Sequence, residues 1–228
     1  MSQETIVLLP GMDGTGQLFG PFLRASADQF TPKVIALPSS GSYNSLLESI
    51  TPRIREAGRV VLLAESFSGH LAVRFTELFP ESVTALVLCN SFVAPPRSPL
   101  LRVVPWSLLF SVSPPSFVVR QFLLGRGASS ELVQSVRASV RETLASVMAS
   151  RIVSVLTEDS TSSLRRVTRP ILYLRGSEDR LVPASSSEWV LRAAKHSVCV
   201  SIPGPHLLLQ RHPEESWAEI TRFLAEAS

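Results

Sequence analysis

The stretch VVLLAESFSGH, residues 60–70, places a serine directly after a short apolar run. Residues 60–64 are continuously apolar, which is typical of a strand buried on both faces. Ser66 has small residues two positions away on either side, Ala64 and Ser68, and Gly69 follows. A sharp turn from a strand into a helix needs such neighbours, because larger side chains would collide with it. The stretch predicts a strained turn with Ser66 at its tip; a helix-capping serine is the alternative.

Five further apolar runs resemble the one before Ser66. All are rich in Val, Ile and Leu, and the complete set covers residues 5–10, 33–38, 60–64, 83–90, 170–176 and 197–203. Segments with helical spacing lie among them, at 44–57, 67–79, 184–195 and 213–226. Alternating strands and helices predict an α/β fold, with a mostly parallel six-stranded sheet flanked by helices. The length of 228 residues fits a single domain.

Residues 92–168 interrupt this alternation. They contain no convincing strand, begin with a proline-rich part, and have a helical pattern after Gly127. We predict a helical cap or lid insertion above the carboxyl edge of the sheet, with residues 1–91 and 169–228 forming the core. Residues 97–169 carry ten arginines and four acidic residues. This excess of positive charge would either attract anionic substrates or form a solvated helix face.

Composition argues against several classes of protein. The net charge is only +3, and no basic run interleaves with aromatic residues, so we expect no nucleic-acid partner. The longest apolar region, residues 103–124, is cut by Pro105, Pro114 and Pro115, which predicts no transmembrane segment. The amino terminus lacks the basic and apolar parts of a signal peptide. We therefore expect a cytoplasmic protein.

A nucleophilic serine needs a general base, and the chain has four histidines. His206 follows the last predicted strand in a Pro/Gly-rich loop, at the same edge of the sheet as Ser66. His70 lies in the helix after Ser66 and is expected to pack there. His196 precedes a strand, at the opposite edge, and His212 looks like a helix-start residue. His206 is therefore the predicted base.

The acid that orients the base is expected on another loop at the same edge. Asp179 follows a predicted strand within GSEDRLVP, and the adjacent Glu178 is its rival. The order Ser, Asp, His along the chain is that of hydrolases whose serine lies on a strand-to-helix turn. No two histidines have metal-ligand spacing and the two cysteines are far apart, so we expect no metal and no cofactor.

Two backbone N–H groups are needed to bind a developing oxyanion. Phe67, directly after Ser66, would supply one. Met12, held by Gly11 in the loop LLPGMDGTG, would supply the other. The alternative for this loop is a phosphate cradle, but it lacks the Lys and Ser/Thr of a P-loop. It also lacks the acidic residue that a dinucleotide fold places after its second strand.

Four motifs, LLPGMDGTG, AESFSG, GSEDRLVP and GPHLLLQRHPEE, follow one another along nearly the whole chain. In order and spacing the chain resembles the α/β-hydrolase superfamily. Its opening L-P-G-x-D-G-T-G is similar to the subset with small bacterial esterases and some plant acyltransferase domains. The resemblance implies Ser66 as nucleophile, Asp179 as acid and His206 as base. It also implies Met12 and Phe67 as oxyanion donors.

Four positions depart from the pattern of that superfamily. Pro10 stands where many members have His before the Gly. Ala64 and Ser68 replace glycines, and Glu65 stands where His is common. None of these departures removes a catalytic group, but they leave the substrate open.

The sequence favours an esterase that cleaves carboxylic esters with short to medium acyl chains. An acyltransferase or amidase using the same acyl-enzyme, and a small-molecule receptor with residual hydrolase activity, are the alternatives. Trp106 and Phe110 are the predicted pocket residues, within a set of apolar side chains expected to fold over Ser66. The set comprises Val103, Val104, Trp106, Leu108, Leu109, Phe110, Phe117, Val118, Phe122 and Leu123. These residues could instead pack together or form a homodimer through the insertion.

Overall fold

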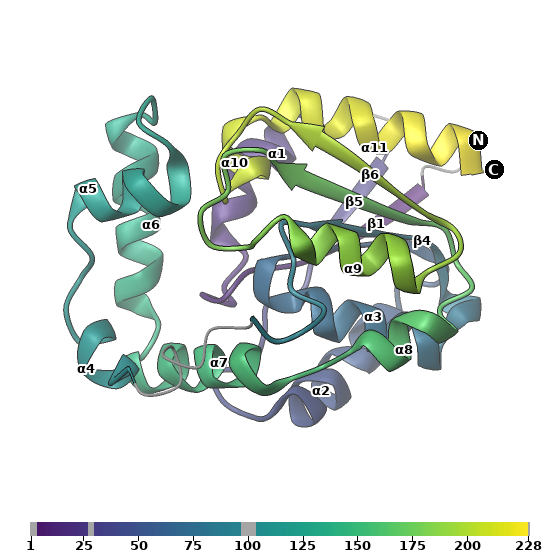
Figure 1. The fold of residues 1–228 in the computed structure, drawn as a ribbon, viewed down its shortest axis with the longest axis horizontal. Coiled ribbons are helices and arrows are strands. Elements are labelled where there is room, and N and C mark those ends of the chain that lie inside the picture. Colours follow the sequence, from purple (N-terminus) through teal and green to yellow (C-terminus); the bar gives the residue numbers. More distant parts are fainter. Residues whose placement is uncertain (1–3, 27–29, 97–103, 228) are drawn as a thin grey trace.

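One sheet of six strands organises the chain in the computed structural model, which describes residues 4–26, 30–96 and 104–227. The strand order is β2-β1-β3-β4-β5-β6, and every neighbouring pair is parallel. Figure 1 labels β1, β4, β5 and β6. The strands are β1 Glu4–Leu9, β2 Phe30–Val34, β3 Val60–Glu65, β4 Val83–Cys89, β5 Ile171–Gly176 and β6 Ser197–Ile202. The predicted parallel six-stranded sheet is confirmed.

Helices cover both faces of the sheet. The α-helices are α1 Gly20–Arg24, α2 Tyr43–Arg55, α3 Gly69–Leu78, α4 Trp106–Phe110, α5 Ser116–Val119, α6 Ser130–Glu142, α7 Ala145–Thr157, α8 Thr161–Arg166, α9 Ser185–Ala193, α10 Leu208–Arg211 and α11 Pro213–Ala227. Shorter turns are η1 Gln17–Phe19, η2 Ser66–Ser68, η3 Pro80–Ser82 and the π-helical η5 Arg120–Leu124. Within the described residues, no helix is long and apolar enough to cross a membrane.

Alternate strand residues point into two apolar layers, as expected for strands buried on both faces. On one face the strands pack against α2, α3, α8 and α9, through residues such as Ile50 and Phe75. On the other they pack against α1, α10 and α11, where Trp217 stacks on Phe22 with ring centroids 4.3 Å apart. The two layers fix the strands, so the loops at the carboxyl edge start from rigid positions.

The second strand differs from the prediction of residues 33–38. It spans Phe30–Val34 and pairs with β1 from Glu4 onward. The Ile35 N–H still donates to the Leu8 carbonyl at 3.0 Å, one residue before β1 ends, so the pairing with β1 sets the carboxyl end of β2. Further along, the backbone bonds to the loop after β1: the Leu37 N–H donates to the Gly14 carbonyl at 2.8 Å. The β2 end is thereby tied to the loop after β1.

The β4–β5 segment, residues 92–168, holds helices α4 to α8 and no strand among its described residues. Helices α4, α5 and α6 stand beyond the end of the sheet toward which the β5 and β6 arrowheads point (Figure 1). Val155 of α7 and Leu164 of α8 belong to the apolar layer under the sheet. The later part of the segment is therefore continuous with the core.

Much of the apolar surface expected to fold over Ser66 instead faces solvent. Leu108 and Phe117 are each 71% exposed, and Leu109 and Phe122 are also exposed. Helices α4 and α5 have only five and four residues, too few to bury more than one side. Val103 lies outside the described residues. Self-association through this exposed surface stays a prediction.

Candidate active site

Ser66 lies at the junction of β3 and α3, in the short turn η2. Its φ angle is 51°, in the left-handed region that a residue with a side chain rarely adopts. Gly69, three residues after Ser66, has no room for a side chain. A Cβ there would lie 2.6 Å from the Phe92 carbonyl oxygen. The strained serine turn predicted from the sequence is therefore present.

Ser68 explains one departure from the glycine pattern. Its hydroxyl donates a hydrogen bond to the Pro10 carbonyl at 2.5 Å, and the side chain is fully buried. A glycine could not make this contact. The hydroxyl ties the turn that carries Ser66 to the loop after β1.

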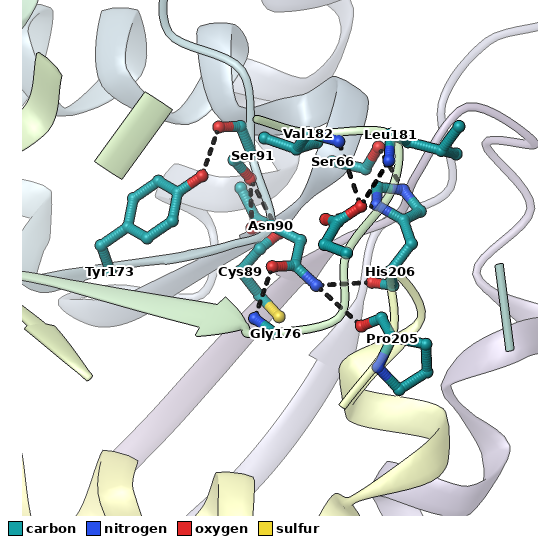
Figure 2. Close-up of polar contacts among 12 residues, drawn as sticks. Ser66, Cys89, Asn90, Ser91, Tyr173, Gly176, Leu181, Val182, Pro205 and His206 are labelled. Atoms are coloured by element: carbon teal, nitrogen blue, oxygen red, sulfur yellow. Dashed lines mark hydrogen bonds and ion pairs between the residues drawn. The ribbon is translucent and has the colours of Figure 1, made fainter. Parts of the chain in front are cut away.

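A chain of hydrogen bonds joins the three predicted catalytic side chains. Ser66 Oγ is 3.0 Å from His206 Nε2, and His206 Nδ1 is 2.9 Å from Asp179 Oδ2. The backbone N–H groups of Leu181 and Val182, labelled in Figure 2, donate to Asp179 Oδ1 at 2.7 and 3.0 Å. With Nδ1–H donating to the carboxylate, Nε2 is left to accept the serine proton.

The other acid and the other three histidines that the sequence offered take no part in this chain of hydrogen bonds. Glu178 is exposed, on the same loop as the aspartate. His70 is a buried residue of α3, and its Nδ1 is 2.8 Å from Ser160 Oγ. His196 is exposed just before β6, and His212 lies between α10 and α11. The structure thus brings together the serine, aspartate and histidine that the sequence singled out.

Burial and two neighbouring carboxylates act on the pKa of the His206 imidazole in opposite directions. Burial by itself lowers its pKa, because a charged ring is poorly solvated there. The Asp179 carboxylate, through its charge and its hydrogen bond, and the Glu65 carboxylate act in the opposite direction. The net result is a His206 pKa raised above its ordinary value of 6.5. The site therefore favours the imidazolium that forms when Ser66 loses its proton.

A cavity of about 270 Å³ opens beside this hydrogen-bonded chain. Ser66, His206, Met12 and Phe67 line it, so both predicted oxyanion donors face the same space as the serine. Apolar side chains of the β4–β5 segment form much of its wall: Trp106, Leu123, Val136, Val140, Met148, Ile152, Val155 and Leu156. This arrangement can hold an apolar acyl chain against the serine hydroxyl.

The two predicted pocket residues have different positions. Trp106 lines the cavity, but Phe110 is absent from its wall. Phe110 lies one turn further along α4 and stacks on Trp106, with ring centroids 6.1 Å apart. The one-turn rise of the helix carries it away from Ser66. Six of the twenty lining residues come from α6 and α7, which the sequence did not single out.

The pattern of the Alpha/beta hydrolase family matches residues 6–219. The chain belongs to this family. Among curated proteins it is similar to the biotin biosynthesis bifunctional protein BioHC of Cellvibrio japonicus (strain Ueda107), with 22% identity over 241 residues. That match covers 98% of this chain and 48% of the relative, so the chain spans about half the relative's length.

Two solved structures share the fold. A thermophilic esterase from Thermogutta terrifontis has a TM-score of 0.81 and 19% identity, covering 99% of this chain and 91% of that one. An enol-lactonase from Burkholderia xenovorans LB400 has a TM-score of 0.78 and 14% identity, covering 99% and 92%. At these identities the likeness shows the fold, and the site must indicate the chemistry.

Asn90, which the sequence reasoning missed, anchors the histidine loop of this α/β hydrolase (Figure 2). Its φ is 42°, and its Nδ2 donates to the carbonyls of Pro205 and His206 at 3.1 and 2.7 Å. Its Oδ1 accepts the Gly176 N–H at 2.8 Å. An asparagine at the end of a predicted strand tolerates this backbone conformation, which was the available signal.

Glu65 is a second buried acid directly before the nucleophile. It is 2% exposed and lines the cavity, and its Oε2 accepts a 3.3 Å bond from Gln210 Nε2. Its Oε1 has no hydrogen-bond partner in the described structure. Burial raises the Glu65 pKa to about 7, and the Asp13 carboxylate adds to this, although Gln210 and His206 oppose it. Its charge is therefore sensitive to pH near neutrality.

Within residues 4–26, 30–96 and 104–227, no three His, Cys, Asp or Glu side chains are grouped so that they could hold a metal ion.

Proposed function

We propose that this α/β hydrolase cleaves carboxylic esters with short to medium acyl chains through a covalent acyl-enzyme. The observation that supports this most is the hydrogen-bonded chain of Ser66, His206 and Asp179, of which Ser66 and His206 line an apolar cavity. The fold shared with an esterase and an enol-lactonase agrees with an ester-type substrate.

In the first half of the reaction, Ser66 Oγ attacks the ester carbonyl carbon while His206 Nε2 takes its proton. Asp179 stabilises the imidazolium through Nδ1. The carbonyl oxygen becomes an oxyanion, bound by the N–H groups of Met12 and Phe67. As the intermediate collapses, the C–O bond of the alcohol breaks. His206 donates its proton to the leaving alkoxide, and the acyl group remains on Ser66.

The second half repeats these steps with water. His206 removes a proton from the water, whose oxygen attacks the acyl carbon, and the same two N–H groups bind the oxyanion. When that intermediate collapses, Ser66 recovers its proton from His206 and the free acid leaves. The acid and base roles of one histidine thus alternate through the cycle.

Cavity size supports the acyl-chain limit. A volume of about 270 Å³ lies at the lower end of small-molecule sites, and its wall is almost entirely apolar. Each methylene that still fits would contribute about 0.8 kcal/mol of binding. The gain would stop where the cavity ends.

A fluorophosphonate probe and a series of p-nitrophenyl esters from acetyl to palmitoyl test the proposal. We expect labelling at Ser66 and a maximum of kcat/KM at a short or medium chain. Ser66→Ala should lose labelling and about 10⁶-fold in kcat, as expected for loss of such a nucleophile. Ser135→Ala, on the exposed side of α6, is the control and should keep both. More than a few per cent activity in Ser66→Ala would reject the proposed nucleophile.

A further inference from the structure

Arg151, on α7, is a charged side chain in the interior, with only 4% of its surface exposed. Among the described residues, no carboxylate lies within ion-pair distance of its guanidinium. A buried cation without a carboxylate partner is costly unless its donors are satisfied in another way. The contacts of Arg151 should therefore show what the residue is for.

The guanidinium contacts the two residues proposed as oxyanion donors. Its Nη1 donates to the Met12 carbonyl at 2.7 Å, and Cζ lies 5.7 Å from the centroid of the Phe67 ring. Its Nη2 donates to the Pro38 carbonyl, also at 2.7 Å. One side chain thus bridges the loops that follow β1 and β2 and lies over the residue after the nucleophile.

The loop after β1 passes close to the Arg151 guanidinium at Gly14. Gly14 has φ +73°, and a Cβ there would collide with the guanidinium. Helix α6 and the residue after it hold the same loop. Ser139 Oγ donates to Asp13 Oδ2 at 3.0 Å, and Thr143 Oγ1 donates to the Asp13 carbonyl at 3.2 Å. A glycine-rich loop is intrinsically mobile, so these contacts from the β4–β5 segment restrict it.

Phe67 is restrained by a second contact as well. The Tyr43 ring stacks on it with centroids 4.7 Å apart and an angle of 17°. The Tyr43 hydroxyl donates to the Phe67 carbonyl at 3.0 Å. Phe67 is therefore held by its carbonyl and its ring, and Met12 by its carbonyl. These contacts fix the peptide units that directly follow the two residues, and so restrict the backbone on which the two N–H groups lie.

We propose that Arg151 is a positioning residue that orients the Met12 and Phe67 N–H groups toward the oxyanion. The inference rests on the proposed function of this site. Oxyanion donors are effective only when they are fixed before the charge develops. A planar guanidinium bonds the two carbonyls through separate nitrogens while its face lies over the ring, whereas a lysine ammonium has one nitrogen for all three contacts. The β4–β5 segment would then supply part of the catalytic geometry as well as the cavity wall.

Arg151→Met tests this role, because methionine keeps much of the length of the side chain and removes the donors. We expect kcat to fall about 10²-fold, the size of effect seen when one oxyanion donor is lost, with KM changed less than about threefold. The Ki of butylboronic acid, which forms a tetrahedral adduct with serine, should rise by the same factor as kcat falls. A merely structural role would lower Tm without this matched change.

Arg137→Met is the matched control. Arg137 is a half-buried arginine of α6 whose Nε donates to the Pro114 carbonyl at 3.0 Å. We expect kcat within about twofold of the wild type. Arg151→Lys should fall between the wild type and Arg151→Met. Methylguanidinium should restore at least tenfold in kcat to Arg151→Ala, whereas methylammonium should not.

Each outcome has a defined meaning. If Ser66→Ala abolishes turnover but Arg151→Met stays within threefold of the wild-type kcat, the proposed function stands and this inference is wrong. If the wild type shows no reaction at Ser66, both are wrong. If Arg151→Met does not fold, Arg151→Lys and the rescue of Arg151→Ala decide. Full activity in Arg151→Lys, or no rescue by methylguanidinium, overturns the inference.

Discussion

The carboxyl edge of the sheet keeps its key side chains buried and hydrogen-bonded, whereas the first helices of the β4–β5 segment expose large apolar ones. At the edge, the side chains of His206 and Asp179 are 5% and 2% exposed, and both are hydrogen-bonded. On α4 and α5, Leu108 and Phe117 are each 71% exposed. At the edge, a small displacement of a side chain breaks a hydrogen bond. On α4 and α5, the same displacement of an exposed side chain breaks few contacts.

The helices of the β4–β5 segment differ from one another in the same way. Its helices α6 and α7 contact the loop after β1 through Ser139 and Arg151, while α4 contributes Trp106 to the cavity. Substitutions at the edge should therefore act on catalysis, and substitutions in α4 on the binding of the acyl chain. Four experiments test or refine this contrast, and their expected effects decrease in the order given.

The largest effect is expected at Asp179. Asp179→Asn should lower kcat by roughly 10⁴, the size of effect that the equivalent change has in a serine protease, because an amide no longer holds His206 in the tautomer that accepts the serine proton. Glu178→Gln, on the exposed neighbour, should change kcat less than about threefold. Steady-state kinetics of both variants check this. The reverse ranking would assign the acid to Glu178.

Asn90→Ala tests whether the histidine loop depends on its anchor. The substitution leaves the buried Gly176 N–H and the His206 carbonyl without their partner, so the free energy of unfolding should fall by about 1–3 kcal/mol. We also expect kcat to fall by about 10- to 100-fold as His206 shifts. Asn44→Ala, at an exposed bond to Arg74, is the control. Equal effects of the two variants would contradict the anchoring role.

Trp106→Ala should weaken binding more than catalysis. Loss of this part of the cavity wall should raise KM for medium-chain esters about tenfold, corresponding to ~1.4 kcal/mol of apolar contact. The KM for acetyl esters should hardly change. Leu108→Ala removes an exposed side chain of the same helix and should stay within about twofold. A chain-length profile that is unchanged in Trp106→Ala would show that α4 does not bind the acyl group.

Glu65→Gln should have the smallest effect on kcat of the four variants. It should, however, shift the pH dependence of kcat/KM. His206 must be neutral to accept the serine proton, so kcat/KM falls as pH drops through the His206 pKa. The Glu65 carboxylate raises that pKa, and its removal should move the acid limb to lower pH. The variant should therefore keep relatively more activity at acidic pH. Glu178→Gln is the control, and an acid limb that stays in place would refute the coupling.

The repeated apolar runs were sufficient to predict the inner strands β1, β3, β4 and β5, because strands buried on both faces cannot alternate polar and apolar residues. The run at 197–203 also predicted the edge strand β6, although β6 is only partly buried. Ser66, Asp179 and His206 could be named because each closely follows a strand. Parallel strands bring such positions to one edge whatever the loop details. The bounds of β2 could not be predicted, because they depend on the pairing with β1.

The sequence by itself thus determined the parallel sheet and the set of three residues whose side chains meet at its edge. Only the tertiary structure decided that Arg151 contacts Met12, 139 residues away in the chain, and that Asn90 holds His206, 116 residues away. It also decided which apolar side chains of residues 92–168 face the cavity. Strand patterns are local and repeat, whereas these contacts depend on how distant segments pack, and no local spacing records that.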